Sequence, residues 1–176
     1  MKKSTTLQLV LAALFTALGI LLPAVFHPFG LAGSVFLPMH IPVLLCGFIV
    51  GSTYGALTGF IIPFLSNAFT SMPHLYPTAI SMALELAAYG FFAGFLSKRL
   101  NVFVSLVGAM LAGRIVMGFA NFVLLGLSGD SYIFSTFITA AFVTALPGII
   151  IQLILIPVLL YALKKTDVMK RLFTDG

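Results

Sequence analysis

An arginine side chain interrupts an otherwise apolar stretch of the chain. Residues 107–125 read VGAMLAGRIVMGFANFVLL, with Arg114 near the centre and Asn121 seven residues later. A guanidinium group keeps its proton in proteins and is costly to bury in hydrocarbon. Charged side chains in such runs normally face the interior of a helix bundle or a watery cavity, where they find a partner. Arg114 therefore predicts a polar site within an apolar bundle.

Two other apolar runs carry a polar side chain near their centres. If each run crosses a membrane as a helix, these side chains and Arg114 share one depth. Asn121 lies about 10 Å from Arg114 along the same helix and returns to the same face. The three central residues are Glu85 in residues 75–96, Arg114 in residues 101–125 and Gln152 in residues 141–163.

Further polar residues are predicted to lie toward the outer side of this level. Asn67 stands at the end of the apolar run 40–72, and His74 and Tyr76 follow in the next loop. Together with Asn121 they predict a polar track from the outer surface to mid-membrane.

The polar residues allow two interpretations. Glu85 and Arg114 could form a buried ion pair that only fixes helix packing, and breaking such a pair is costly. Alternatively, Arg114 binds a carboxylate or phosphate in a site open to the outside, with the amides of Asn67, Asn121 and Gln152 reading other polar groups. The ligand site explains the amides as well, so we favour it. It leaves open whether Glu85 neutralises Arg114, is protonated, faces elsewhere or binds a ligand hydroxyl.

Motifs for other chemistry are missing from the sequence. It has no GxxxxGK[ST], HExxH, GxSxG or CxxC motif, so we expect no catalytic residue and no cofactor on this chain. His27, His40 and His74 have no Cys or carboxylate at a suitable spacing, so we expect no metal site.

Composition indicates a membrane protein. Of 176 residues, 61% are hydrophobic and 7% are charged, and the mean hydropathy is +1.19. A soluble domain of this size could not hide that much apolar surface, so we expect lipid as the solvent. The net charge of +5 comes from basic residues at the ends of apolar runs, which favours membrane orientation over nucleic-acid binding. We expect one membrane-embedded domain over residues 1–176.

The distribution of basic residues predicts the topology. We expect an all-α protein with six transmembrane helices: one over residues 5–22, two within 40–72 that turn near Ser52, and one each over 75–96, 101–125 and 141–163. Pro147 separates a first helical turn from the last helix. Of the nine Lys and Arg residues, eight then fall on one side, which places both termini in the cytoplasm. The eight are Lys2, Lys3, Lys98, Arg99, Lys164, Lys165, Lys170 and Arg171.

The sequence also predicts a lid in residues 23–39 and a helix-contact surface on the first helix. The segment 23–39 holds three prolines, two glycines and three phenylalanines, which predicts an apolar outer loop that packs down as a lid through Phe26, His27 and Phe29. In the first helix, Ala13 and Ala17 have the small-xxx-small spacing that permits close helix contact. Packing within the chain would use the same spacing.

Three stretches resemble one transporter family. They are the A-x-x-x-A of residues 13–17, HIPVLLCGFIVGSTYGALTGFIIPFLS of residues 40–66, and SMPHLYPTAISMALELAAYGFFAGFLSKR of residues 71–99. Nearly the whole chain resembles a substrate-binding S component of an energy-coupling factor (ECF) vitamin transporter. The two longer stretches are similar to the pantothenate type.

The resemblance implies a transport subunit in a bacterial plasma membrane. It implies a vitamin site under the first loop, and a complex with a transmembrane T component, held through Ala13 and Ala17, and two ATPase subunits. ATP hydrolysis on those subunits would drive release of the vitamin inside the cell. Arg114 would take the carboxylate of pantothenate. Another vitamin or precursor (pyridoxine-like, pyrimidine or folate-like), an intramembrane enzyme that uses Glu85, and a purely structural protein remain alternatives.

Overall fold

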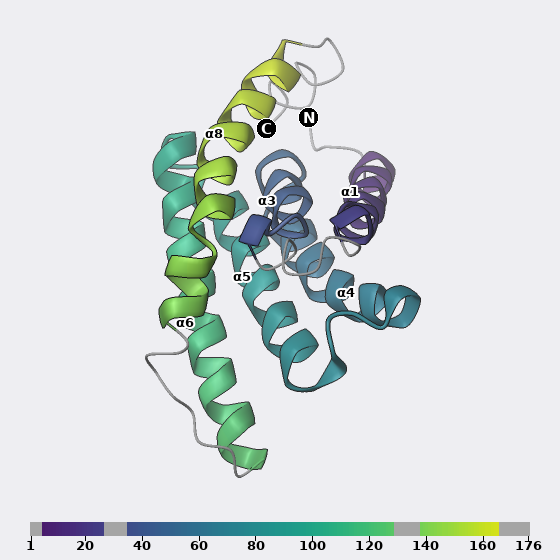
Figure 1. Ribbon diagram of the computed structural model, residues 1–176. Coiled ribbons are helices and arrows are strands. Elements are labelled where there is room, and N and C mark those ends of the chain that lie inside the picture. Colours follow the sequence, from purple (N-terminus) through teal and green to yellow (C-terminus); the bar gives the residue numbers. More distant parts are fainter. Residues whose placement is uncertain (1–4, 27–34, 129–137, 166–176) are drawn as a thin grey trace.

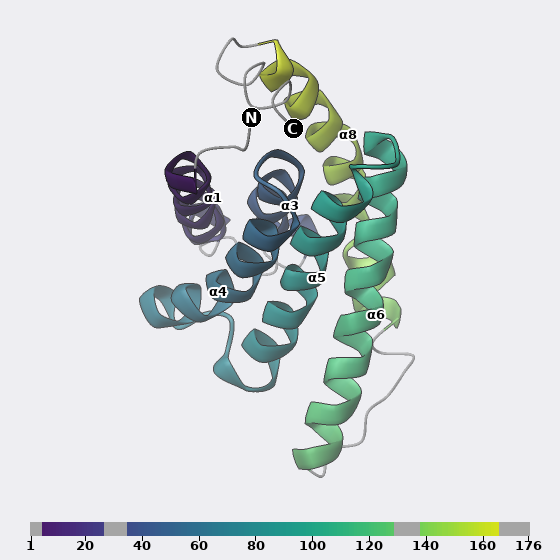
Figure 2. The same cartoon turned by 180° about the vertical axis from the view of Figure 1, so that it is seen from behind.

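The computed structural model describes residues 5–26, 35–128 and 138–165, and these residues form helices and short connections without a strand. The chain builds a helix bundle (Figures 1 and 2). Its longer helices are α1 (Thr5–Phe26), α3 (His40–Ile49), α4 (Ser52–Thr70), α5 (Ile80–Leu96), α6 (Val102–Ser128) and α8 (Leu146–Lys164). A short wide turn precedes two of them: η2 (Leu75–Ala79) before α5 and η3 (Thr139–Thr144) before α8.

Helix α5 lies at the centre of the bundle. It packs against α3, α4 and α6, while α1 packs on α3 and α4. Helix α8 contacts α3 and α6, on the side of the bundle away from α1 (Figures 1 and 2). Three helices with polar residues, α3, α5 and α6, therefore meet in the interior.

Four predicted spans are confirmed as helices long and apolar enough to cross a membrane. Their outward faces carry large apolar side chains, such as Ile115 and Phe119 on α6 and Ile154 on α8. Such a surface suits lipid rather than water. The four are Thr5–Val25, Leu75–Leu96, Val102–Gly126 and Leu146–Leu163.

The predicted turn near Ser52 is confirmed, because α3 and α4 form a hairpin joined by Val50 and Gly51. Gly51 adopts a φ of 124°, which residues with a side chain rarely reach. Helix α3 has ten residues and is only about 15 Å long, half the thickness of a hydrocarbon core. The number of crossings within this hairpin therefore stays a prediction.

Two predicted helix ends are wrong. The first helix continues past Pro23 to Phe26, although the sequence suggested that it ends at residue 22. Proline is tolerated here, as it is at Pro63 in α4 and Pro157 in α8, because helices in apolar surroundings can satisfy the freed backbone groups locally. Helix α6, predicted to end at residue 125, also continues through residues 126–128. The separate turn before Pro147 is confirmed.

Glycines bring the backbones of α3, α4 and α5 into direct contact. A Cβ atom at Gly90 of α5 would collide with the Gly55 carbonyl oxygen of α4, and one at Gly59 would collide with the Leu86 carbonyl. Gly47 of α3 faces the Gly90 carbonyl in the same way. Small residues permit such close approach in membrane proteins. This packing fixes α5, and with it Glu85, against its neighbours.

Apart from the buried Arg114, the described basic residues gather at one end of the bundle. Lys98 and Arg99 lie in the turn between α5 and α6, and this turn and the end of α8 share one end of the molecule in both views (Figures 1 and 2). Lys165 follows α8 and lies over the ring of Tyr161, 4.6 Å from its centroid. The arrangement agrees with the predicted clustering of charge, while the side of the membrane stays a prediction.

Candidate functional site

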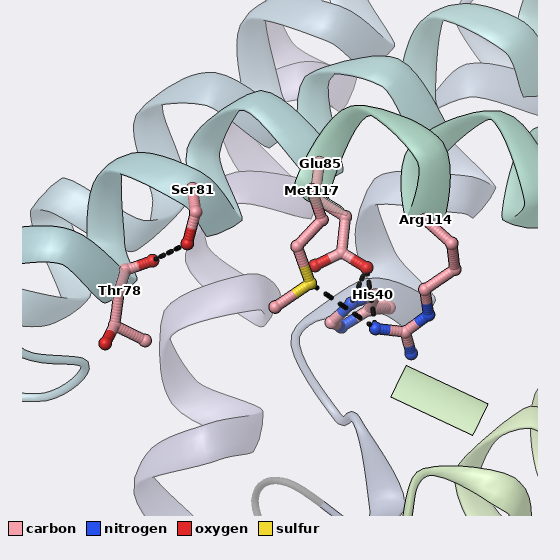
Figure 3. Close-up of polar contacts among 6 residues, drawn as sticks. All are labelled: His40, Thr78, Ser81, Glu85, Arg114 and Met117. Atoms are coloured by element: carbon pink, nitrogen blue, oxygen red, sulfur yellow. Dashed lines mark hydrogen bonds and ion pairs between the residues drawn. The ribbon is translucent and has the colours of Figure 1, made fainter. Parts of the chain in front are cut away.

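A buried ion pair joins α5 and α6. Glu85 Oε1 lies 2.8 Å from Arg114 Nη1, and the two side chains are 1% and 6% exposed. Gly113 makes this possible, because it lies against the Glu85 carbonyl and the Tyr89 ring and lets α6 approach α5. Arg114 Nη1 also contacts the Met117 sulfur at 3.7 Å. Figure 3 shows the guanidinium reaching toward Glu85 and His40.

His40 completes the cluster from a third helix. Its Nε2 atom lies 3.7 Å from Glu85 Oε1, and its ring meets the Tyr89 ring edge-on at 5.2 Å between centroids (Figure 3 shows His40 beside Glu85). Tyr89, one helical turn after Glu85 on α5, is fully buried. Carboxylate, guanidinium, imidazole and phenol thus share one small volume inside the bundle.

His40 was not predicted as a site residue. It begins the apolar run 40–72, and the first residue of a membrane-crossing run is expected near the membrane surface. Helix α3 begins at His40 beside Glu85 and is short, so its first residue lies as deep as the centre of α5. The available signal was a histidine immediately before a run of ten apolar or small residues, 41–50.

Several buried polar atoms of this region lack a hydrogen-bond partner among the described residues. They are Arg114 Nε and Nη2, both ring nitrogens of His40, and both side-chain polar atoms of Gln152. Buried polar groups are nearly always hydrogen-bonded, and leaving one unpaired costs about 1–3 kcal/mol. Such a concentration of unused donors and acceptors indicates a site that receives a polar ligand or ordered water.

Gln152 approaches the interior from α8. It is fully buried, and Gly148 on the same face lies against the backbone of Val35 and Phe36, just before α3. Because α8 packs on α3 and α6, Gln152 faces the helices that carry His40 and Arg114. Its predicted membership of the site is compatible with this position.

The other predicted site residues lie nearer the end of the bundle opposite to Lys98 and Arg99. Asn67 is half-buried at the end of α4 and donates a hydrogen bond from its amide nitrogen to the Pro73 carbonyl at 2.8 Å. His74 is exposed, and the Tyr76 hydroxyl donates to the Leu124 carbonyl on α6. Asn121 is half-buried on α6. The hydrogen bonds of Asn67 and Tyr76 hold the loop before α5, and a role of these four residues in ligand binding stays a prediction.

Residues 27–34 of the predicted lid lie outside the described residues. His27 and Phe29 belong to that part, and Phe26 is described only as the last residue of α1. Ala13 and Ala17 are exposed on α1, whereas Phe15 and Gly19 face the bundle. The two alanines are therefore available to a partner rather than used in packing within the chain.

The sequence was compared with known protein families. It matches the model of the family described as ECF transporter, substrate-specific component, over residues 7–160. The chain belongs to this family. No curated protein and no solved structure matches it.

Membership of this ECF family fixes the general role. The chain is a multi-pass membrane protein and the substrate-binding subunit of an ECF importer, not an enzyme. Such substrate-specific components bind a small molecule and work with a T component and ATPases. The unpaired polar atoms at Arg114, His40 and Gln152 are the described features best suited to hold that small molecule.

Proposed function

We propose that this ECF component captures pantothenate outside a bacterial cell and delivers it, with a T component and two ATPase subunits, to the cytoplasm. The observation that supports this proposal most is which nitrogens of the Arg114 guanidinium have a partner. Its Nη1 atom pairs with Glu85, while its Nε and Nη2 atoms are buried and have no partner among the described residues. The N–H bonds of Nε and Nη2 point the same way and form a two-pronged donor that matches a carboxylate.

The remaining polar groups suit the rest of such a ligand. Pantothenate carries two hydroxyls and an amide besides its carboxylate. Gln152 offers one unused donor group and one unused acceptor from α8, and Asn121 stands about 10 Å outward of Arg114 on α6. His27 and Phe29 of the first loop, with Phe26 at the end of α1, would close over the ligand.

A second candidate is another vitamin or precursor, folate-like, pyrimidine or pyridoxine-like, and among these we place a neutral pyrimidine or pyridoxine-like compound first. The close Glu85–Arg114 pair favours it, because that pair leaves no net charge for an anion. A neutral heterocycle or amide could use the free donors of Arg114 and the free acceptor of Gln152 together.

Ligand titration distinguishes these candidates. The full chain would be purified in lipid nanodiscs and titrated calorimetrically with pantothenate and with members of the neutral classes. We expect saturable binding of pantothenate and none of the others. Tight binding of a neutral compound alone would move the assignment to that class, and binding of no vitamin, with or without the partner subunits, would refute the proposal.

The proposed coupling has its own test. In cells, uptake of radiolabelled pantothenate should require the ATPase partners, while binding to the purified chain should not. Uptake that persists after deletion of the ATPases would contradict an ECF mechanism for this chain.

A further inference from the structure

The free edge of Arg114 and the charge around it constrain how a carboxylate can bind. Glu85 occupies Nη1, so an incoming carboxylate would use Nε and Nη2 without displacing Glu85. The ligand would then stand on one side of the guanidinium and Glu85 on the other.

In that arrangement the net charge of the buried cluster would change when the carboxylate binds. Arg114 supplies one positive charge and Glu85 one negative charge, so the empty cluster is neutral. A bound carboxylate would leave one uncompensated negative charge among side chains that solvent does not reach. Burying an unpaired charge is strongly unfavourable, and proteins normally respond by changing a protonation state.

The described helices around the cluster hold few groups that could respond. Helix α5 supplies Glu85 and Tyr89, and α6 supplies only Arg114. In α3 the remaining groups are His40 and Cys46, and Cys46 faces Thr58 of α4 instead. Helix α1 has no titratable side chain. Tyr76 of η2 bonds to the Leu124 carbonyl, Tyr54 lies in the first turn of α4, and Tyr161 and Lys164 lie in the last turn of α8.

His40 is the member of this set that can add a positive charge near neutral pH. Its Nε2 atom lies 3.7 Å from Glu85 Oε1, and neither ring nitrogen has a hydrogen-bond partner among the described residues. A proton on Nε2 would therefore point at the carboxylate that already faces Arg114. His40 and Arg114 would then flank Glu85 as two cations around one anion.

We infer, building on the proposed function, that the site binds its carboxylate ligand together with one proton, which His40 holds against Glu85. The anion and one proton from solvent enter together, so the occupied cluster is again neutral: Arg114 and His40 positive, Glu85 and the ligand negative. The chain thus selects a monoanionic carboxylic acid, and His40 acts as the residue that balances its charge.

This linkage has a definite direction. The ligand-bound protein holds more protons than the free protein, so a rise in pH weakens binding. Where His40 is neutral in the free protein and protonated in the complex, the apparent Kd rises about tenfold per pH unit. At lower pH, where His40 is protonated in both states, the Kd is constant. The ligand carboxyl group is ionised throughout the range from about pH 5.5 to 8.5 and adds no slope of its own.

Calorimetry measures the proton directly. Pantothenate would be titrated into the full chain in nanodiscs, at one pH, in two buffers with different ionisation enthalpies, and the titration repeated from about pH 5.5 to 8.5. We expect uptake of close to one proton per ligand in the upper part of this range. Pantothenol, in which an alcohol replaces the carboxylate, should bind more weakly and without proton uptake.

Two variants locate the proton. Glu85→Gln removes the charge that demands compensation, so pantothenate should bind to it with no proton uptake and a pH-independent Kd. His40→Gln keeps a polar side chain but cannot carry the charge, so proton uptake should disappear and binding at the lower pH should weaken at least about tenfold. Thermal unfolding of each variant shows whether it is folded.

The outcomes separate this inference from the proposed function. Pantothenate binding by the unmodified chain with a constant Kd and no proton uptake would overturn the inference and leave the proposed function standing. Proton uptake that survives in a folded His40→Gln protein would overturn the role of His40. Absence of any pantothenate binding by the folded chain would refute the proposed function itself.

Discussion

Glu85 and Arg114 are 2.8 Å apart, and both side chains are almost completely buried. Removing one member of such a pair leaves the other as an uncompensated buried charge, at a cost of about 3–5 kcal/mol. Replacing both with apolar residues is often nearly neutral. These two facts allow the structural contribution of the pair to be separated from ligand recognition.

Arg114→Lys should weaken ligand binding more than it destabilises the protein. Lysine keeps a positive charge opposite Glu85 but lacks the two-pronged edge formed by Nε and Nη2. We expect the Kd for pantothenate to rise about thirtyfold, equivalent to about 2 kcal/mol, with a much smaller change in thermal stability. Calorimetric titration and a thermal unfolding curve of the same sample measure both quantities.

The double variant Arg114→Met, Glu85→Leu is the matched control. It should fold, because no charge is left unpaired, and it should not bind pantothenate. Arg114→Ala alone should lose several kcal/mol of stability. If the double variant binds pantothenate as well as the unmodified chain does, Arg114 has only a structural role.

At this scale the sequence predicted part of the site. Arg114, Glu85 and Gln152 could be grouped because each stands near the centre of a long apolar run, and the structure buries all three. His40 could not be grouped with them, because the first residue of an apolar run is expected at the membrane surface. Helix α3 has only ten residues, so its first residue can lie deep in the bundle. The bonds from Asn67 and Tyr76 to backbone carbonyls depend on loop geometry that no residue pattern specifies.

Helix packing depends on glycines in contact across α3, α4 and α5. Gly55 and Gly90 face each other so closely that a methyl group at Gly90 would collide with the Gly55 backbone. Backbone atoms cannot move aside as a flexible side chain can, so a larger residue must push two helices apart. Because α5 carries Glu85, such a displacement also reaches the site.

Gly90→Ala should therefore lower the free energy of unfolding by about 3 kcal/mol and weaken ligand binding. The matched control is Gly126→Ala in α6, where an added Cβ atom meets nothing within 4 Å. That change should be neutral or stabilising by up to about 1 kcal/mol, because alanine favours helix. Thermal unfolding followed by tyrosine fluorescence compares them, and equal stability of the two variants would contradict the packing described for Gly90.

Element positions were predicted better than element ends. Apolar runs and the charged turn at Lys98 and Arg99 were enough to locate α5, α6 and α8. The end of α1 was wrong because Pro23 was taken as a helix breaker, a rule that holds less strictly in apolar surroundings. The length of α3 could not be predicted either, because the apolar run continues from α3 into α4 without a charged residue that would mark the end of α3.

For the whole molecule, the predicted orientation can be tested with introduced cysteines. Cys46 is the sole cysteine and is buried, so Cys46→Ala gives a background without reactive thiols. Met72 and Lys98 are both exposed, one in the loop before α5 and the other in the turn after it. In intact cells, a membrane-impermeant thiol reagent should label Met72→Cys and spare Lys98→Cys.

Permeabilised cells provide the control for that experiment. Both cysteines should then react, because both positions are exposed in the folded chain. Labelling of Lys98→Cys in intact cells would reverse the assigned orientation, since basic residues are expected on the cytoplasmic side.

Assembly with a T component requires a surface on which another helix can pack. Ala13 and Ala17 are exposed on the face of α1 that points away from the bundle, whereas Gly19 lies against Ile62 of α4. Small residues on an outer face allow another helix to approach closely, and in lipid that contact depends on shape rather than on hydrophobicity. Ala13→Leu and Ala17→Leu should therefore abolish uptake while the Kd for pantothenate stays within about twofold.

The control enlarges a lipid-facing residue elsewhere. Ile115 on α6 is 73% exposed, so Ile115→Phe should change neither binding nor uptake. Uptake in cells, calorimetric titration of the purified chain, and co-purification of the T component measure the three steps separately. Loss of binding in the alanine variants would show that this face of α1 supports the site, because a pure assembly surface must leave capture of the ligand intact.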